Sequence, residues 1–392
     1  MPAFDVEAVR ERFPALARPL IFLDGPGGSQ VPQTVIDAMT CCLRDANANL
    51  DGAFPTSLGA TAIVARARDA AAEFTGSTPE EIAFGPNMTT LNFLLAHAVA
   101  RTLAPGEEIV VTDLDHDANV SPWLIVARDH GLVVRHAPIR SEDGTLDEDA
   151  LEALLGPRTR VVAFTLASNA LGSIPDAKRI ADAAHAAGAL AWADGVHLAP
   201  HRQLRRAELG LDVLLCSPYK FFGPHAGIAA IRRDLAASLP ADRVRPASED
   251  PPGHRFETGT QSHEALAGTI AAIEYVGSVG YDAIAAHETE LAKRFLVGLE
   301  RIPAAQLYGI PGVEGRTPTF CLSLGGLDPR HVTTELAAAG IQAWDGDYYA
   351  PGPMRALALQ DRGAVRIGLL HYNTAAEVDR TLEALATVAK AA

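Results

Sequence analysis

Asp212-Val213-Leu214-Leu215-Cys216-Ser217-Pro218-Tyr219-Lys220 is an apolar run that ends in polar residues and a lysine. A second run of the same kind, Ala189-Leu190-Ala191-Trp192-Ala193, ends in Asp194-Gly195-Val196-His197. Short continuous apolar runs are typical of strands that are buried on both faces of a parallel sheet. The carboxyl ends of such strands meet at one edge of the sheet, where ligands bind. The two runs therefore predict that Lys220 and Asp194 lie together at this edge.

Similar apolar runs alternate with alanine-rich helical stretches through the first two thirds of the chain. This alternation is typical of βαβ units. We therefore expect an α/β fold with a large, mostly parallel, seven-stranded sheet flanked by helices. The expected strands are Glu81–Phe84, Glu108–Thr112, Leu132–His136, Arg160–Leu166, Ala189–Ala193, Asp212–Cys216 and Gly227–Ile231.

The C-terminal part of the chain predicts a smaller α+β domain. Its expected strands are Thr319–Leu324 and Val365–Leu369, and its expected helices are Pro329–Ala339 and Ala375–Ala391. We expect residues 16–275 to form the large domain, and residues 1–15 and 276–392 to form the small one. The polar, proline-rich stretch Arg243–Phe256 lacks periodicity and predicts a loop over the site.

Composition excludes several classes of function. The chain has 392 residues and a net charge of −15, which argues against nucleic-acid binding through a basic face. No apolar run approaches the length of a membrane span, and the N-terminus lacks the pattern of a secretory signal. The cysteines Cys41, Cys42, Cys216 and Cys321 form no Cys-x-x-Cys pair. We expect reduced thiols, a cytoplasmic location, and no metal site.

Lys220 and Asp194 together indicate a particular cofactor. A lysine in an apolar cleft loses its proton more easily and can form a Schiff base. A nearby aspartate can keep a pyridine nitrogen protonated. The pair therefore predicts a site for pyridoxal 5'-phosphate (PLP), which serves as an electron sink. The alternative is a solvated lysine and a structural carboxylate, which is the commoner situation for each residue type.

Further candidates follow other predicted strands. Thr89 lies at a predicted helix start, where free N–H groups can hold an anion such as the cofactor phosphate. Ser217 is a second candidate donor to that phosphate. The alternative for Thr89 is an ordinary helix cap. His116 can stack on a ring, or belong to a surface loop. Asn169 can bind substrate or cofactor, or only form a turn. Arg366 interrupts an apolar strand and needs an anionic partner, either a substrate carboxylate or a structural aspartate.

Taken in order, these motifs resemble the class V aminotransferase superfamily of fold-type I PLP enzymes, and within it the cysteine desulfurase-like branch. The resemblance covers nearly the whole chain. It is carried by Phe22–Gln30, Asn87-Met88-Thr89, Asp115–Trp123, Ser168-Asn169-Ala170-Leu171-Gly172, Asp194-Gly195-Val196-His197, Ser217-Pro218-Tyr219-Lys220, Arg255–Thr260 and Arg366–Asn373.

The resemblance implies roles for individual residues. Lys220 would carry the cofactor and move protons, Asp194 would pair with the pyridine nitrogen, and His116 would stack on the ring. His197 would lie next to the phenolic oxygen, and Asn169 and Arg366 would hold the substrate. The phosphate would be bound by Met88, Thr89, Ser217 and Tyr219, and by Thr260 of the neighbouring subunit of a homodimer.

The chain departs from the desulfurase pattern in the region Ile341–Pro353, which is expected to be a loop. Tyr349 occupies the position of the loop cysteine, and Trp344 occupies that of a second arginine. Without a thiolate there is no nucleophile to accept sulfur. The aromatic residues suggest a different or larger substrate side chain.

The sequence leaves several functions open. The favoured one is β-elimination from a sulfur-containing amino acid by a C–S lyase, because that reaction needs no cysteine. Transamination and epimerisation at Cα also need none. Cysteine desulfuration is less favoured, and a PLP-binding protein without catalysis is the least favoured.

Overall fold

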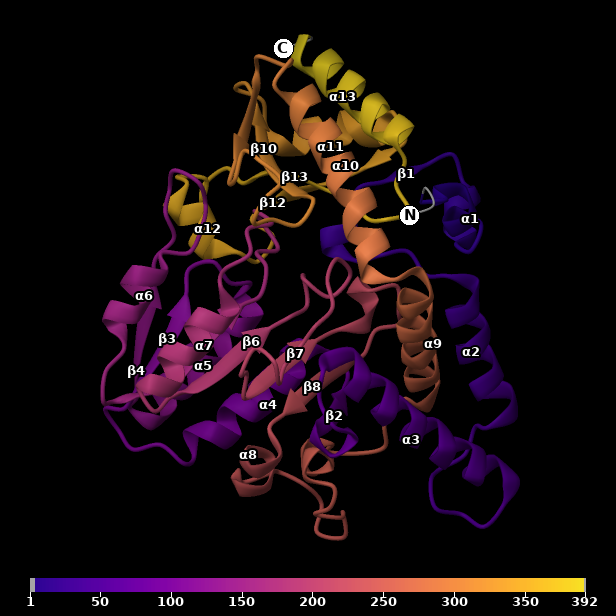
Figure 1. Ribbon diagram of the computed structural model, residues 1–392, viewed down its shortest axis with the longest axis vertical. Coiled ribbons are helices and arrows are strands. Elements are labelled where there is room, and N and C mark those ends of the chain that lie inside the picture. The colour runs from indigo at the N-terminus through magenta and orange to yellow at the C-terminus, as the bar shows by residue number, and fades with distance from the viewer. Residues whose placement is uncertain (1–3, 391–392) are drawn as a thin grey trace.

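The computed structural model describes residues 4–390, and its largest sheet has seven strands in the order β2-β8-β7-β6-β5-β3-β4 (Figure 1). Six strands run parallel, and β8 runs antiparallel between β2 and β7. The large, mostly parallel sheet is therefore confirmed, and each strand boundary lies within one residue of its expected place. The strands are β2 (Ile82–Gly85), β3 (Glu108–Thr112), β4 (Val133–Ala137), β5 (Thr159–Thr165), β6 (Leu190–Asp194), β7 (Val213–Cys216) and β8 (Gly227–Ile231).

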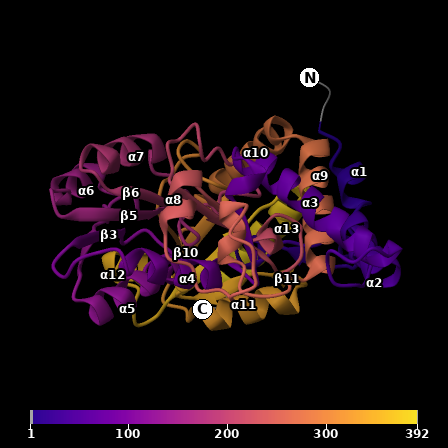
Figure 2. The ribbon, with the colours of Figure 1, turned by 90° about the horizontal axis from the view of Figure 1, so that it is seen from below.

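Helices cover both faces of this sheet (Figure 2). On β5, Val161 and Ala163 share one core, and the alternate residues Val162 and Phe164 share another. Burial on both faces explains why the strands are apolar without alternation. Helices α4 (Met88–Ala100) and α5 (Ser121–His130) lie on one face, and α6 (Glu148–Leu154) and α7 (Ala177–Ala186) lie on the other.

A second, antiparallel sheet has the order β12-β13-β10-β9 and packs with α10, α11 and α13. The expected strands at 319–324 and 365–369 correspond to β10 and β13. The expected helices correspond to α11 and to α13, although Ala391 lies outside the described residues. The bounds are β9 (Ala305–Tyr308), β10 (Thr319–Leu324), β12 (Trp344–Gly346), β13 (Ala364–Gly368), α10 (Tyr281–Leu299), α11 (Pro329–Ala338) and α13 (Ala375–Lys390).

The remaining elements join or flank the two sheets. β1 and β11 form a short parallel pair. Helix α9 ends before Gly280, whose φ of 85° breaks it from α10. The division into domains at residues 15/16 and 275/276 remains a prediction. These elements are α1 (Val6–Arg10), α2 (Gln33–Asp45), α3 (Pro55–Thr75), α8 (Arg233–Ser238), α9 (His263–Val279), α12 (Pro351–Ala356), β1 (Ile21–Phe22) and β11 (Ile341–Gln342), with short 3-10 turns at η1 (Pro14–Ala17), η2 (Gly25–Gly27), η3 (Pro79–Glu81), η4 (Asp117–Asn119), η5 (Pro218–Lys220) and η6 (Pro252–Phe256).

Two expectations about loops were wrong. Residues 341–353 are not a single loop, because β11, β12 and the start of α12 lie within them. The stretch Arg243–Phe256 does not cover the carboxyl edge of the sheet in its own subunit. Its last residues form η6, and a Cβ added at Gly253 would lie 2.4 Å from the carbonyl oxygen of Ile82, at the opposite end of β2.

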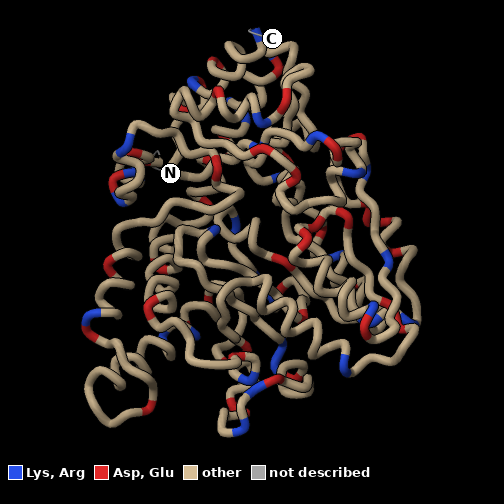
Figure 3. The backbone as a smooth tube through the Cα atoms, turned by 180° about the vertical axis from the view of Figure 1, so that it is seen from behind, with Lys and Arg blue, Asp and Glu red and all other residues tan. Residues whose placement is uncertain are grey.

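Two general features of the chain are the distribution of its charged residues and the apolar character of its helices. Basic and acidic residues are interspersed along the chain (Figure 3). Within residues 4–390, no helix is both long enough and apolar enough to cross a membrane.

A buried ion pair fixes the segment after η6 against β2. The Glu257 carboxylate accepts from Arg68 Nη2 at 2.7 Å and from the Phe84 N–H at 2.9 Å. The Arg68 and Glu257 side chains are 10% and 1% exposed. Removing one member of such a pair leaves a buried charge without its partner.

We predict that Glu257→Gln lowers the free energy of unfolding by about 3–5 kcal/mol, because the Arg68 charge loses its counterion. Urea unfolding followed by circular dichroism measures the change. The control is Asp45→Asn, which removes an ion pair whose side chains are 64% and 59% exposed and should cost about 0–1 kcal/mol. Equal losses in the two variants would contradict the prediction.

Candidate active site

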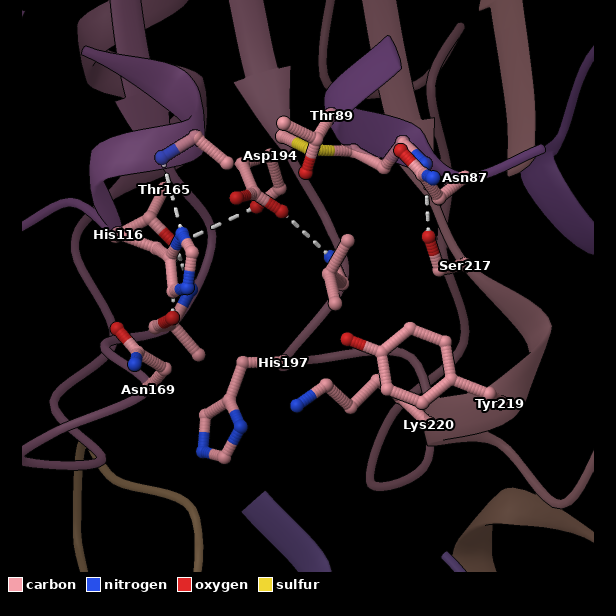
Figure 4. A pocket seen from close by; sticks show the side chains of 14 residues that line it. Asn87, Thr89, His116, Thr165, Asn169, Asp194, His197, Ser217, Tyr219 and Lys220 are labelled. Carbon is pink, nitrogen blue, oxygen red and sulfur yellow. Dashed lines mark hydrogen bonds between the residues drawn. The ribbon is translucent and has the colours of Figure 1, made fainter. Parts of the chain in front are cut away.

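A cavity lies at the carboxyl ends of β5, β6 and β7 and at the start of α4 (Figure 4), and measures about 500 Å³ including its open mouth. All the predicted cofactor-binding residues except Thr260 line it. They are Met88, Thr89, His116, Asn169, Asp194, His197, Ser217, Tyr219 and Lys220.

Lys220 enters this cavity from η5, directly after β7. Its ammonium donates to the Pro26 carbonyl oxygen and lies 5.0 Å from the centre of the Tyr219 ring. Burial lowers the pKa of Lys220 to about 7, and the Arg366 charge acts in the same direction. Asp194 and Asp24 oppose the shift. A substantial fraction of Lys220 is therefore a neutral amine, and so a nucleophile, near neutral pH.

Asp194 is the last residue of β6 and is 4% exposed. Its carboxylate accepts a hydrogen bond from the Val196 N–H at 2.8 Å. Burial raises the pKa of Asp194 to about 6, whereas the hydrogen bond and the Lys220 charge oppose that rise. Asp194 forms no salt bridge within the described part of the chain. A buried carboxylate of this kind is stabilised by a cationic partner, and a protonated pyridine nitrogen would be one.

The start of α4 forms one wall of the cavity. Asn87 caps the helix by accepting from the Thr90 N–H at 2.7 Å, and the Met88 N–H donates to the Ser217 hydroxyl at 2.9 Å. A Cβ at Gly227 would lie 2.4 Å from the Asn87 carbonyl carbon, so glycine allows β8 to approach this turn. Helix N-termini bind anions through their free N–H groups. With the Thr89 and Ser217 hydroxyls, this wall fits a phosphate.

Two neutral imidazoles lie on the opposite side of the cavity. His116 accepts at Nδ1 from the Ala118 N–H at 3.0 Å, and burial lowers its pKa to about 4. His197 is 4% exposed, with its Nε2 2.9 Å from the Thr319 hydroxyl. Burial holds the pKa of His197 well below its usual value. Both rings can therefore contact a cofactor without adding charge.

A second, outer cavity of about 1,500 Å³, including its open mouth, adjoins the first. Arg366, on β13, points its guanidinium over the Tyr348 ring at 4.3 Å, and its Nη1 donates to the Asn169 carbonyl oxygen at 3.0 Å. The Arg366 Nε and the Asn169 Oδ1 are buried without partners. Among the described residues no carboxylate forms a salt bridge with Arg366, so the alternative of a structural aspartate is not supported.

The remaining predicted residues divide into two groups. Trp344 and Tyr349 line the outer cavity, as expected for substrate-binding residues. Thr260 is exposed and does not line either cavity. Tyr219 lines both cavities, and its ring stacks on His225 with centroids 5.2 Å apart.

Sequence reasoning missed several residues at the site. Tyr348 is held at a φ of 60°, and its carbonyl oxygen accepts from Asn169 Nδ2 at 2.9 Å. A positive φ at a tyrosine has no sequence signal. Asp24 lies in the Phe22–Gln30 motif, and burial raises its pKa to about 6. Asp24 could have been identified in the sequence from its position at the end of a strand, next to Gly25. Asn87 could have been identified as the N-cap residue of a helix.

The amine, the carboxylate and the anion-binding helix start together fit PLP. The cavity brings an unpaired buried carboxylate, a nucleophilic amine and a phosphate-sized wall to one place. When bound, the cofactor would offer a partner to each group: its ring nitrogen to the carboxylate, its aldehyde to the amine, and its phosphate to the helix start.

Comparisons with known proteins agree with this arrangement. The family model for aminotransferase class-V matches residues 21–381. An aminotransferase-like protein of Gibberella zeae is 35% identical, with 98% of this chain and 99% of that protein covered. A probable cysteine desulfurase of Mycolicibacterium paratuberculosis is 34% identical over 99% of this chain, which spans only 58% of that longer protein.

Solved structures give the same result. The apo structure of a cysteine desulfurase from Thermococcus onnurineus has a TM-score of 0.92, 27% identity and 98% coverage of both chains. A cysteine desulfurase from Escherichia coli, in an S-sulfonic acid form, has a TM-score of 0.89, 25% identity and 99% coverage of both chains. With a matching family model over nearly the whole chain and a cavity that fits the cofactor, this chain belongs to the class V aminotransferase family of PLP-dependent enzymes.

Proposed function

We propose that this enzyme is a C–S lyase, which removes the Cα proton of a sulfur-containing amino acid and eliminates the sulfur group from Cβ. The observation that carries the proposal is that the site has groups suited to Cα chemistry but has no cysteine on the walls of either cavity. Relatives named as cysteine desulfurases support a sulfur amino acid as substrate. Elimination is the sulfur chemistry that needs no active thiolate.

The positions of the four cysteines support this choice. Cys216 and Cys321 are fully buried, and burial raises the pKa of both thiols. Cys41 and Cys42 lie on α2, outside both cavities. A sulfur-accepting cysteine must be an accessible thiolate. In our proposal Tyr349 occupies the position of that cysteine, and a phenol does not accept sulfur.

We propose the following roles for the chain's own groups. When PLP is bound, it supplies an electron sink for the pair left at Cα. Lys220 would hold the cofactor and would take the Cα proton of the substrate at its Nζ. Asp194 would keep the pyridine nitrogen protonated. His116 would stack on the ring, and His197 would contact the phenolic oxygen.

The substrate carboxylate would be held by the Arg366 guanidinium, whose Nε is buried without a partner. Asn169 would contact the substrate beside it and could accept from a substrate N–H at its free Oδ1. Met88, Thr89, Ser217 and Tyr219 would hold the phosphate. The overall reaction balances: the Cα–H and Cβ–S bonds break, the sulfur leaves with the bonding pair and takes a proton, and water releases ammonia and a 2-oxo acid from the remaining fragment.

Two further features of the assembly belong to the proposal. Thr260, exposed on its own subunit, would reach the phosphate in the neighbouring subunit of a homodimer. The cytoplasmic location expected from reduced cysteines also remains a prediction.

A second candidate is transamination, which the aminotransferase-like relative of Gibberella zeae favours. It would use the same Lys220 and Asp194 but would leave the Cβ–S bond intact. Epimerisation would return the Cα proton to the opposite face of Cα. Neither needs a cysteine, so the products of the reaction separate the candidates.

Incubation of the holoenzyme with cysteine, cystine and cysteine S-conjugates should produce equal amounts of 2-oxo acid, ammonia and a sulfur product. Lactate dehydrogenase coupling and thiol detection measure them. Lys220→Ala should abolish turnover, since no base remains at Cα. Conversion of the cofactor to its amine form without thiol release would instead indicate transamination, and alanine with a protein-bound persulfide would indicate desulfuration. Either result would contradict the lyase proposal.

The uptake of PLP by the apoenzyme should depend on pH through Lys220. Its pKa is lowered to about 7, and only the neutral amine attacks the aldehyde. The rate of attachment, followed by stopped-flow absorbance, should rise about tenfold per pH unit well below pH 7 and level off above it. Arg366→Gln should move the midpoint to higher pH, because the Arg366 charge helps to lower the Lys220 pKa. A rate that kept rising to pH 10 in the unmodified chain would contradict the lowered pKa.

A further inference from the structure

The outer cavity has an aromatic wall that the reaction itself does not use. Trp344 and Tyr349 are 48% and 73% exposed, which is unusual for such large side chains. Both line the outer cavity together with Phe93 and Ile125. These four side chains give the outer cavity, which Lys220 also lines, an apolar and largely aromatic wall.

The position of Trp344 is fixed relative to Arg366. The two residues are directly opposite each other in the antiparallel pair β12–β13. Side chains of opposed residues lie on the same face of a sheet. The Trp344 indole also lies against the backbone of η2, since a Cβ at Gly27 would come within 2.3 Å of its Nε1. A substrate whose carboxylate binds Arg366 would therefore have the indole at its side.

Tyr349 is held by backbone hydrogen bonds, one of them to the 3-10 turn η4. Its φ is 54°, and its N–H donates to Asp347 Oδ1 at 3.0 Å. Its carbonyl oxygen accepts from the Asp117 N–H at 2.7 Å. Its ring lies 5.7 Å from that of His116, at an interplanar angle of 30°. The backbone contacts place the exposed phenol at the mouth of the cavity, next to the residue proposed to stack on the cofactor.

The charges around the mouth select among possible substituents. Asp117, Asp345 and Asp347 line the outer cavity, and of these three only Asp345 has a salt bridge among the described residues, to Arg330 at 3.2 Å. Arg366 is the only arginine there, and it is proposed to be occupied by the substrate carboxylate. An anionic substituent would therefore meet carboxylates at the rim, and an uncharged ring would meet aromatic faces.

We propose that the substrates are cysteine S-conjugates whose sulfur carries an uncharged aromatic group, and that Trp344 and Tyr349 determine this specificity. This inference rests on the proposed function in placing the substrate carboxylate on Arg366. In the bound state the aromatic group lies between the Trp344 indole and the Tyr349 phenol, while Cα and Cβ lie over Lys220.

Binding to the holoenzyme tests the proposal without requiring turnover. S-benzyl-L-cysteine, S-carboxymethyl-L-cysteine and L-alanine are titrated while the visible absorption of the bound cofactor is recorded. S-benzyl-L-cysteine should bind most tightly. Trp344→Ala and Tyr349→Ala should each weaken its binding about 2- to 10-fold. The same variants should leave L-alanine binding within about twofold, and Trp344→Phe and Tyr349→Phe should restore most of the loss.

Fluorescence gives an independent measurement. The chain has three tryptophans, and Trp123 and Trp192 are fully buried. Quenching by acrylamide therefore reports Trp344, and S-benzyl-L-cysteine should protect it whereas L-alanine should not.

Equal affinities for S-benzyl-L-cysteine and L-alanine, or equal losses for both in the alanine variants, would overturn the proposal. So would a Trp344 that acrylamide does not reach in the free holoenzyme, because another surface would then cover it. The two proposals fail separately. Tight, Trp344-dependent binding without thiol release would reject the lyase and keep the aromatic specificity, and thiol release without that dependence would do the reverse.

Discussion

The site depends on an electrostatic constraint: an amine and a carboxylate are buried at the ends of two neighbouring parallel strands, and neither has a salt bridge among the described residues. β6 ends in Asp194, β7 leads into η5 and Lys220, and both side chains line one cavity. Burial disfavours the charged form of each, so the pKa of Lys220 falls to about 7 and that of Asp194 rises to about 6. In the proposed function PLP would satisfy both groups, since its aldehyde would take the Lys220 amine and its ring nitrogen would give Asp194 a cationic partner.

The surrounding groups follow from the same fold. The loop from β2 into α4 brings free N–H groups to the same edge as the strand ends, and the antiparallel strand β8 passes beside it at Gly227. Arg366 arrives from the second sheet and is held by Asn169 and Tyr348. In the proposed function the large sheet would thus supply the cofactor contacts, and the small sheet would supply the carboxylate contact and the aromatic wall. The division suits an enzyme family in which cofactor chemistry is shared and substrates differ.

The large sheet was predictable because its strands are buried on both faces. Continuous apolar runs such as Val213–Cys216 mark them clearly, and the residue after each run that forms a parallel strand lies at the carboxyl edge. The family resemblance then added His197 and Thr260, which strand position alone does not assign. The short strands β9 and β12 lack such runs. Trp344 and its neighbours in β12 are partly exposed, so residues 341–353 were expected to be a loop. The positive φ angles of Tyr348 and Tyr349 depend on tertiary contacts with Asn169 and Asp117, and no local pattern encodes them.

The most direct measurement of the central claim is to reduce the holoenzyme with borohydride and locate the cofactor by peptide mass mapping. The chain has only four lysines, Lys178, Lys220, Lys293 and Lys390. Lys178 and Lys293 lie on the surface of helices, 52% and 54% exposed in pairs with Asp182 and Glu290. We predict that the reduced phosphopyridoxyl group is found on the Lys220 peptide alone, in one equivalent per chain. Modification spread over the surface lysines, or no modification of Lys220, would contradict the account.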